Sequence, residues 1–149
     1  MTGGGAVSNE DYMREALTLA KECLVTGDVP VGCVVVSPVG EIIGRGRNRR
    51  EELGSATRHA EVEAIEAACA RLTGCSLYVT LEPCPMCAGA IWNARLSDLW
   101  YGAREARSGC CGSVVNLFAE GLDHTTAVRG GLLEEECAAV LGEFFQARR

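Results

Sequence analysis

Hydrophobic and polar positions alternate along this chain with a helical period in some stretches and a strand period in others. Apolar residues recur at helical spacing over residues 12–24, and Ser8 with Asp11 forms a capping pair just before them. Two β-rich runs follow at 31–36 and 41–46, separated by a Ser-Pro-Val-Gly turn. The pattern therefore predicts a helix followed by a β-hairpin.

The rest of the chain predicts helices that alternate with strands. Helices are expected from His59 to Leu72, at 84–94 and at 132–148, the last with one apolar face. Strands are expected at 76–81, 98–102 and 127–130, a loop at 47–57, and a short helix within the glycine-broken segment 109–117. Such alternation predicts an α/β fold: a mixed five-stranded sheet in a three-layer domain, mostly parallel after its antiparallel opening.

Composition narrows the class of protein. The 149 residues fit one domain, expected at 8–149 after a flexible, Gly-rich tail at 1–7. Hydrophobic residues make up 48% of the chain and charged residues 23%, which excludes disorder, and the apolar runs are too short to span a membrane. The tail has neither a basic start nor a long apolar stretch, so we expect no signal peptide and a cytoplasmic protein.

The nine cysteines raise the question of disulfides. An odd count and no export signal favour reduced thiols. Cys23, Cys33, Cys69 and Cys137 stand at positions with the spacing of a hydrophobic core. We expect these four to be small buried hydrophobic residues.

Two short motifs carry the chemistry: His59-Ala60-Glu61, and a Pro-Cys-Pro-Met-Cys run at 83–87. The imidazole of His59 and the thiolates of Cys84 and Cys87 form a ligand set for one zinc ion per chain, with a fourth position open for water. Both motifs open predicted helices, whose positive ends favour thiolate over thiol. Glu61 lies outside the ligand set and is free to carry protons between water and a substrate. This combination predicts a catalytic zinc.

Simpler interpretations exist for each part of the pattern. A Cys-x-x-Cys pair can be half of a structural four-cysteine zinc site or a redox pair, but a second such pair is missing and Cys110-Cys111 are adjacent. Glu61 alone could be a first-turn acid that stabilises a helix dipole. His59, one of only two histidines in the chain, stands directly before a helix, and this context favours the catalytic interpretation.

The charge of the chain does not decide whether its partner is a nucleic acid. The net charge of −6 argues against nucleic acid, yet arginines cluster at 45, 47, 49, 50 and 58, and Lys21 is the one lysine. Arginine suits planar contacts with phosphate. A solvated basic loop explains the cluster equally well.

The chain resembles bacterial tRNA-specific adenosine deaminases, members of the cytidine deaminase-like fold, from Tyr12 to Arg149. His-x-Glu with Pro-Cys-x-x-Cys is the signature of zinc nucleobase deaminases and indicates only the superfamily. The flanking stretches indicate the branch: Val-Pro-Val-Gly at 29–32, Asn48, Thr-Arg-His-Ala-Glu at 57–61, Thr-Leu-Glu-Pro-Cys-Pro-Met-Cys-Ala-Gly-Ala at 80–90, Gly-Ala-Arg at 102–104, and Phe144-Phe145 ahead of Arg148-Arg149.

The resemblance implies a homodimer that hydrolytically deaminates the wobble adenosine of a tRNA anticodon stem-loop to inosine. It implies that His59, Cys84 and Cys87 bind zinc and that Glu61 carries protons. The substrate-binding residues that it implies are Asn48 on the base, Val31 and the Ala60 backbone around it, Glu105 where the family has Asp, His124 beside the flanking nucleotides, and Arg148 and Arg149 on RNA. A dimer is also expected because Ile91, Trp92, Leu96, Leu99 and Trp100 would expose apolar surface on so small a domain.

Two rival functions share the fold. A deaminase of a free purine base or nucleoside, similar to guanine deaminase, would have the same zinc site. A non-catalytic partner subunit would typically lack the acid that Glu61 provides.

Overall fold

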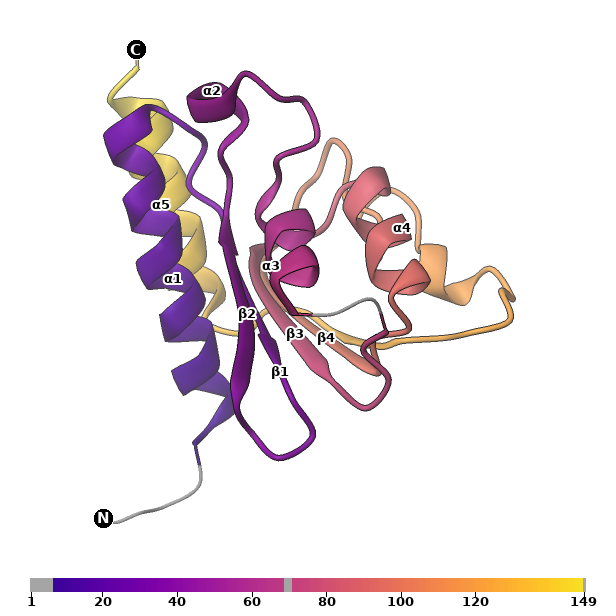
Figure 1. Cartoon of the computed structure of the whole chain (residues 1–149). Helices are drawn as coiled ribbons and strands as arrows, with labels where there is room; N and C mark the ends of the chain where they lie inside the picture. The colour runs from indigo at the N-terminus through magenta and orange to yellow at the C-terminus, as the bar shows by residue number, and fades with distance from the viewer. Residues whose placement is uncertain (1–6, 69–70, 149) are drawn as a thin grey trace.

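A single five-stranded sheet organises the protein, whose structure is a computed structural model that describes residues 7–68 and 71–148 (Figure 1). The strand order is β2-β1-β3-β4-β5. β1 (Gly32–Val36) is antiparallel to both β2 (Ile42–Arg47) and β3 (Ser76–Leu81). β4 (Asp98–Ala103) and β5 (Ala127–Arg129) continue the sheet parallel to β3. The predicted mixed sheet with an antiparallel opening is confirmed.

Helices cover both faces of the sheet (Figure 1). α1 (Asn9–Thr26) and α5 (Glu134–Gln146) lie side by side on one face, and α3 (Ala60–Ala68) and α4 (Pro85–Asn93) cover the other. Alternate residues of β1 serve the two layers, because successive strand side chains point to opposite faces. Val34 and Val36 belong to the core under α1 and α5, whereas Cys33 and Val35 belong to the core under α3 and α4. The three-layer prediction is confirmed.

Local sequence sets both ends of α1. The Ser8 hydroxyl accepts a hydrogen bond from the Asp11 backbone N–H, and the Asp11 carboxylate accepts one from the Ser8 backbone N–H. This is the predicted capping box, which satisfies two backbone donors at the helix start. Gly27 ends the helix with a φ of 76°, a left-handed conformation that glycine adopts without steric cost.

Three local predictions differ from the structure. α3 ends at Ala68, and Leu72 is buried outside it; the predicted core position Cys69 lies outside the described residues. The expected loop at 47–57 contains a short helix, α2 (Arg50–Leu53). The segment 109–117 holds turns and a bridge between Cys111 and Asn116, and a 3-10 helix, η1 (Leu117–Ala119), begins only at its end.

α3 packs closely against β2 because two glycines face it. A Cβ atom on Gly44 or Gly46 would collide with the carbonyl oxygens of Ala64 and Ala60, respectively. The buried side of α3 is consequently Ala60, Glu61 and Ala64, whereas Val62 and Ile65, part of the expected apolar face, are only partly buried. This close approach fixes the start of α3 at the end of the sheet where the chemistry lies.

The burial of the cysteines agrees with the prediction for the three core positions that the structure describes. Cys23, Cys33 and Cys137 are buried free thiols. No helix within 7–68 or 71–148 is long and apolar enough to cross a membrane. Of the predicted tail only Val7 is described, and Arg149 lies outside the described residues.

The apolar surface expected to drive dimerisation is largely absent. Ile91, Leu96 and Leu99 are completely buried within the chain, in the core under α3 and α4. Trp92 and Trp100 are partly buried, and Trp100 stacks on Tyr78 with ring centroids 6.0 Å apart. The expectation that all five side chains are exposed was wrong, because Ile91, Leu96 and Leu99 pack into the core of this chain.

Candidate active site

Three potential metal donors converge where α3 and α4 begin. His59 directly precedes α3, Cys84 is the N-cap of α4, and Cys87 lies buried in the first turn of α4. The Nδ1 atom of His59 lies 3.6 Å from the Sγ of Cys84 and 3.5 Å from the Sγ of Cys87. A tetrahedral zinc with Zn–N of about 2.05 Å and Zn–S of about 2.3 Å would set each N–S pair about 3.6 Å apart. The donor atoms therefore fit zinc in both chemistry and spacing.

Hydrogen bonds within the donor group favour the thiolate form of Cys84. A hydrogen bond from Cys87, together with those to His59 and to the Cys87 backbone N–H, lowers the pKa of Cys84 to about 4 despite its partial burial. The same pairing with Cys84, together with burial, raises the pKa of Cys87. The pairing with Cys84 raises the pKa of His59 as well. A dication would compete directly with these shared protons, since thiolate and neutral imidazole are the forms that bind metal.

Glu61 lies in the same pocket but outside the donor group. The group of three whose donor atoms all lie within 4.8 Å of one another contains His59, Cys84 and Cys87 without Glu61. The carboxyl group is 4% exposed, and burial raises its pKa to about 7. Such a group can both accept and donate a proton near neutral pH, as acid–base catalysis requires.

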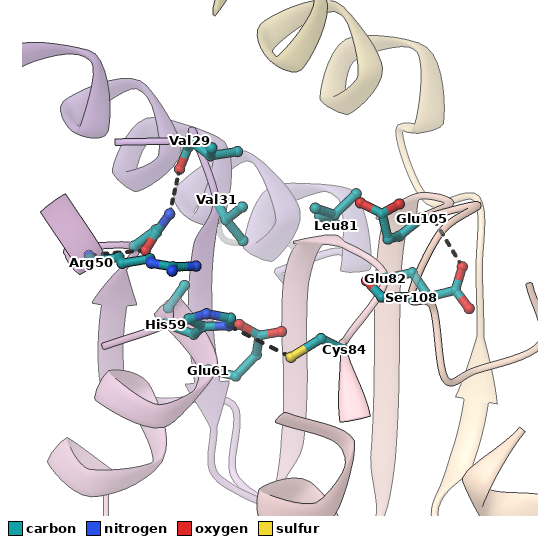
Figure 2. Close-up of a pocket in the computed structure, with 12 residues that line it drawn as sticks. Val29, Val31, Arg50, His59, Glu61, Leu81, Glu82, Cys84, Glu105 and Ser108 are labelled. Atoms are coloured by element: carbon teal, nitrogen blue, oxygen red, sulfur yellow. Dashed lines mark hydrogen bonds between the residues drawn. The ribbon is translucent and has the colours of Figure 1, made fainter. Parts of the chain in front are cut away.

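A cavity of about 210 Å³ lies over these residues. In Figure 2, His59, Glu61 and Cys84 point toward one another on one side of it, while Val29, Val31 and Leu81 form an apolar side. The cavity is smaller than the roughly 300–1,000 Å³ sites of drug-sized ligands, so it suits a single heterocyclic base. Four of the predicted substrate-binding residues line it together: Val31, Asn48, Ala60 and Glu105.

The amide of Asn48 is held at one wall of the pocket. Its Nδ2 donates to the Val29 carbonyl at 3.1 Å, and its Oδ1 accepts from the Arg50 backbone N–H at 3.1 Å. An amide has two N–H donors and two acceptor lone pairs. One donor and one lone pair of Asn48 therefore remain for a ligand.

The opposite wall depends on Glu82, a residue to which the sequence assigned no role. Its carboxylate is 2% exposed and accepts from the backbone N–H groups of Glu105 (3.1 Å), Cys111 (3.0 Å) and Ser113 (3.0 Å), and from the Ser113 hydroxyl. Burial by itself would raise the pKa of Glu82, but these hydrogen bonds outweigh it and the pKa is lowered. Because the donors are 23–31 residues away in sequence, no local pattern could have revealed them.

The residues predicted to contact RNA lie in two different places: Arg148 is near the pocket, and His124 is far from it. Arg148 lies against the end of α1, where it donates to the Gly27 carbonyl at 2.9 Å and covers the Phe144 ring at 3.9 Å. It lines a second cavity, of about 600 Å³, that shares Val29, Asn48 and Arg50 with the first. His124 is elsewhere: its Nε2 lies 2.9 Å from the carbonyl oxygen of Leu96, at the opposite end of β4 from the pocket. The role of His124 stays a prediction.

Residues 6–103 match the cytidine and deoxycytidylate deaminase zinc-binding region, and the chain belongs to this family of zinc deaminases. The cytidine deaminase-like fold implied by the resemblance is thereby confirmed.

Individual relatives narrow the comparison to particular enzymes within the family. The chain is 44% identical to the tRNA-specific adenosine deaminase of Bacillus subtilis (strain 168) over 147 residues, which covers 95% of this chain and 91% of that protein. It is 46% identical over 142 residues to the tRNA(Ile)-lysidine synthase of Deinococcus deserti, but spans only 27% of that protein's length.

Two solved structures are similar as well. A tRNA:A34 deaminase that carries out A-to-I editing at the wobble position of transfer RNA superposes with a TM-score of 0.83 at 41% identity, over 87% of this chain and 97% of that one. The guanine deaminase of Bacillus subtilis superposes with a TM-score of 0.62 at 40% identity, over 66% of each chain.

Proposed function

We propose that this protein hydrolytically deaminates adenosine to inosine at the wobble position of a tRNA anticodon, with one zinc held by His59, Cys84 and Cys87. The observation that carries the proposal is the buried Glu61 beside a three-donor metal group in a base-sized pocket. The identity with a tRNA-specific adenosine deaminase over 95% of the chain supports the choice of substrate.

The residues of the pocket divide the reaction between them. Zinc bound to the three donors would supply a polarised water whose pKa is near 7. Glu61 takes a proton from the attacking water and passes it to N1 of the purine as oxygen adds to C6. Glu61 then takes the remaining proton from the hydroxyl now on C6 and gives it to the amine, whose bond to C6 breaks so that it leaves as ammonia. Inosine remains, with oxygen on C6 and a proton on N1. Asn48 would hold the edge of the base with its free donor and acceptor, between Val31 and the Ala60 backbone.

A target base reaches such a pocket only after it leaves its stack. Extrusion costs a few kcal/mol and is least costly for nucleotides that are already unpaired. A 210 Å³ pocket with room for a single base therefore favours an adenosine in a loop over one in a duplex.

The arginines beside the pocket favour a polynucleotide over a free base. Arg47, Arg49 and Arg58 of the basic cluster form ion pairs with Glu52, Glu63 and Glu66. Arg50 and Arg148, by contrast, have no acidic partner within residues 7–68 and 71–148, and both border the second cavity. Figure 2 shows Arg50 at the edge of the base pocket. A phosphate flanking an extruded base could bind there.

The rival function is deamination of a free purine base, which the similarity to guanine deaminase favours. The deciding experiment supplies the zinc-loaded protein with an anticodon stem-loop, free guanine and free adenosine at matched concentrations. We expect inosine in the stem-loop at position 34 and little turnover of the free compounds. Rapid loss of ammonia from guanine, with an unchanged stem-loop, would replace the proposal with its rival.

The remaining parts of the proposal concern the whole protein. Residues 8–149 would form a single deaminase domain that acts in the cytoplasm, on tRNA and as a homodimer. The dimer now rests on the resemblance, since three of the five apolar side chains expected at its surface are buried. Sedimentation at micromolar concentration tests it, and a monomer would contradict it.

A further inference from the structure

Asp28 is a fully buried carboxylate, 0% exposed, with no ion pair among the described residues 7–68 and 71–148. Asp28 directly follows Gly27, the residue that caps the C-terminal end of α1. Removing a charge from water without a countercharge is costly unless several donors replace the lost hydration. The position of those donors therefore indicates what the buried charge does.

The donors belong mainly to α2. The Asp28 carboxylate accepts from the backbone N–H of Glu51 at 2.5 Å and of Glu52 at 3.3 Å, and from the Thr26 hydroxyl at 2.7 Å. The N-cap residue of α2, Arg49, makes no capping hydrogen bond with its own side chain. Asp28 thus supplies, from a distant part of the chain, the cap that satisfies the free N–H groups of this short helix. It joins the 28–31 segment to the 48–52 segment.

Asn48 lies within this joint. Its side chain spans the same two segments, since it donates to Val29, the neighbour of Asp28, and accepts from Arg50, the neighbour of Glu51. Its backbone N–H donates to the Val31 carbonyl at 3.0 Å. If the segments separated, the Asn48 amide could rotate, and its free donor and acceptor would no longer have one direction.

We propose that Asp28 is a positioning residue for base recognition: by tying α2 to the 28–31 segment, its carboxylate fixes the direction in which Asn48 presents its amide to the base. Asp28 does not line the base pocket itself, so it acts through Asn48 and not on the reacting atoms. The inference rests on the proposed function only in that Asn48 contacts a base.

The test is a double-mutant cycle with Asp28→Asn and Asn48→Ala, in zinc-loaded protein and with whichever base the wild type deaminates. Asp28→Asn places an amide against backbone donors, so we expect KM to rise roughly 5- to 100-fold, as an unmade hydrogen bond implies. In the Asn48→Ala background the same change should alter KM by less than about 2-fold, because the residue through which it acts is gone. Equal effects of Asp28→Asn in both backgrounds would overturn the inference.

A second readout needs no substrate, so it remains valid if the tRNA proposal fails. The side-chain amide protons of Asn48 should exchange slowly with solvent in the zinc-loaded wild type and faster in Asp28→Asn, as measured by NMR. Zinc content should be unchanged. Loss of zinc with unchanged Asn48 exchange would place the effect at the metal and overturn the inference.

Matched controls separate positioning from general stability. Asp98→Asn neutralises a carboxylate at the far end of the sheet, where it pairs with Arg129, and should change neither KM nor Asn48 exchange. If Asp28→Asn does not fold, Thr26→Val removes one hydrogen bond to the same carboxylate and provides a milder test. The smaller rise in KM should again vanish in Asn48→Ala, and a rise that persists there would overturn the inference.

Discussion

Single side chains at the start of α3 and α4 define two distinct chemical roles within a few ångströms. His59, Cys84 and Cys87 present one nitrogen and two sulfurs at the spacing of a tetrahedral metal site, whereas Glu61 presents a buried oxygen acid outside that group. The roles can be tested separately, since removing a donor should affect metal binding and removing the acid should not.

Loss of either thiolate should release the metal. We expect Cys84→Ser and Cys87→Ser to retain clearly less than one equivalent of zinc after dialysis, because two remaining donors cannot replace a three-donor site. The measurement is metal analysis of the purified proteins. Cys137→Ser is the control, because the Cys137 thiol is on α5 and packs in the core on the opposite side of the sheet from the metal donors. A full equivalent of zinc in either ligand variant would show that the ligand assignment is wrong.

Loss of Glu61 should separate binding from chemistry. Glu61→Ala should keep its zinc and its fold, yet lose about 10²- to 10⁴-fold in turnover, the usual contribution of a positioned acid–base group. Glu63→Gln is the matched control, since Glu63 is on the same helix but pairs with Arg49 outside the base pocket. Near-normal kcat in Glu61→Ala would refute the role of proton carrier.

These four residues could be predicted from the sequence because each pair of them lies within one short motif at a helix start. His59 and Glu61 are two positions apart, and so their convergence follows from helix geometry. Asp28 and Glu82 could not be predicted in the same way. Most of their partners are backbone N–H groups 23–31 residues away, and every residue type except proline offers that donor.

At the scale of elements, the walls of the pocket are loops that buried carboxylates hold in place. Glu82 gathers residues 105–113, and Asp28 holds α2. The strands and the long helices were predictable, since period and capping are local properties of the sequence. α2 was not, because its cap comes from Asp28, and the end of α3 was placed too late because an apolar residue, Leu72, continued the spacing beyond the helix.

Glu82 should make stability depend on acid pH. Its pKa in the folded protein is lowered below the ordinary value of 4.5, so its contribution is present above that pH and is lost as pH falls through the lower folded-state pKa. At pH 7, Glu82→Gln should reduce the free energy of unfolding by about 1–3 kcal/mol, since an amide is a weaker acceptor and brings its own N–H groups against buried donors.

Urea unfolding of wild type and Glu82→Gln at several pH values measures this difference. The gap between the two proteins should narrow below about pH 4.5, where Glu82 of the unfolded wild type takes up a proton while the folded carboxylate is still ionised. Both proteins retain the metal donors, so any acid-induced loss of zinc affects them alike. A gap that stays constant from pH 7 to pH 4 would contradict the role given to the ionised carboxylate.

At the scale of the whole molecule, a chain of net charge −6 could bind the proposed tRNA substrate only through local positive charge. Ion pairs with glutamates occupy most of the basic cluster, and they leave Arg50 and Arg148 beside the pocket without acidic partners among residues 7–68 and 71–148. The sequence alone could not separate free arginines from paired ones. The glutamates that lie near each arginine in the folded protein decide which arginines remain available for phosphate.

This arrangement predicts how binding of an anticodon stem-loop depends on salt. Each phosphate contact contributes a slope of roughly 0.7–0.9 in log affinity against log salt, so the double change Arg50→Ala and Arg148→Ala should flatten the dependence by about one to two units. KM for RNA should rise more than kcat falls, because neither arginine is a metal donor and neither replaces Glu61 as the proton carrier. Binding measured from 50 to 300 mM salt gives the slope.

Arg14→Ala is the control for this experiment, since Arg14 is exposed near the start of α1, roughly 20 Å along the helix from Gly27 and the second cavity. It removes one positive charge, half of what the double change removes, but should leave the slope unchanged. A free-base deaminase predicts a different outcome, because a neutral purine has no phosphate to bind. Its turnover would be independent of salt and indifferent to both arginines, and that result, with no inosine in the stem-loop, would exclude tRNA as the substrate while leaving the zinc chemistry of the pocket intact.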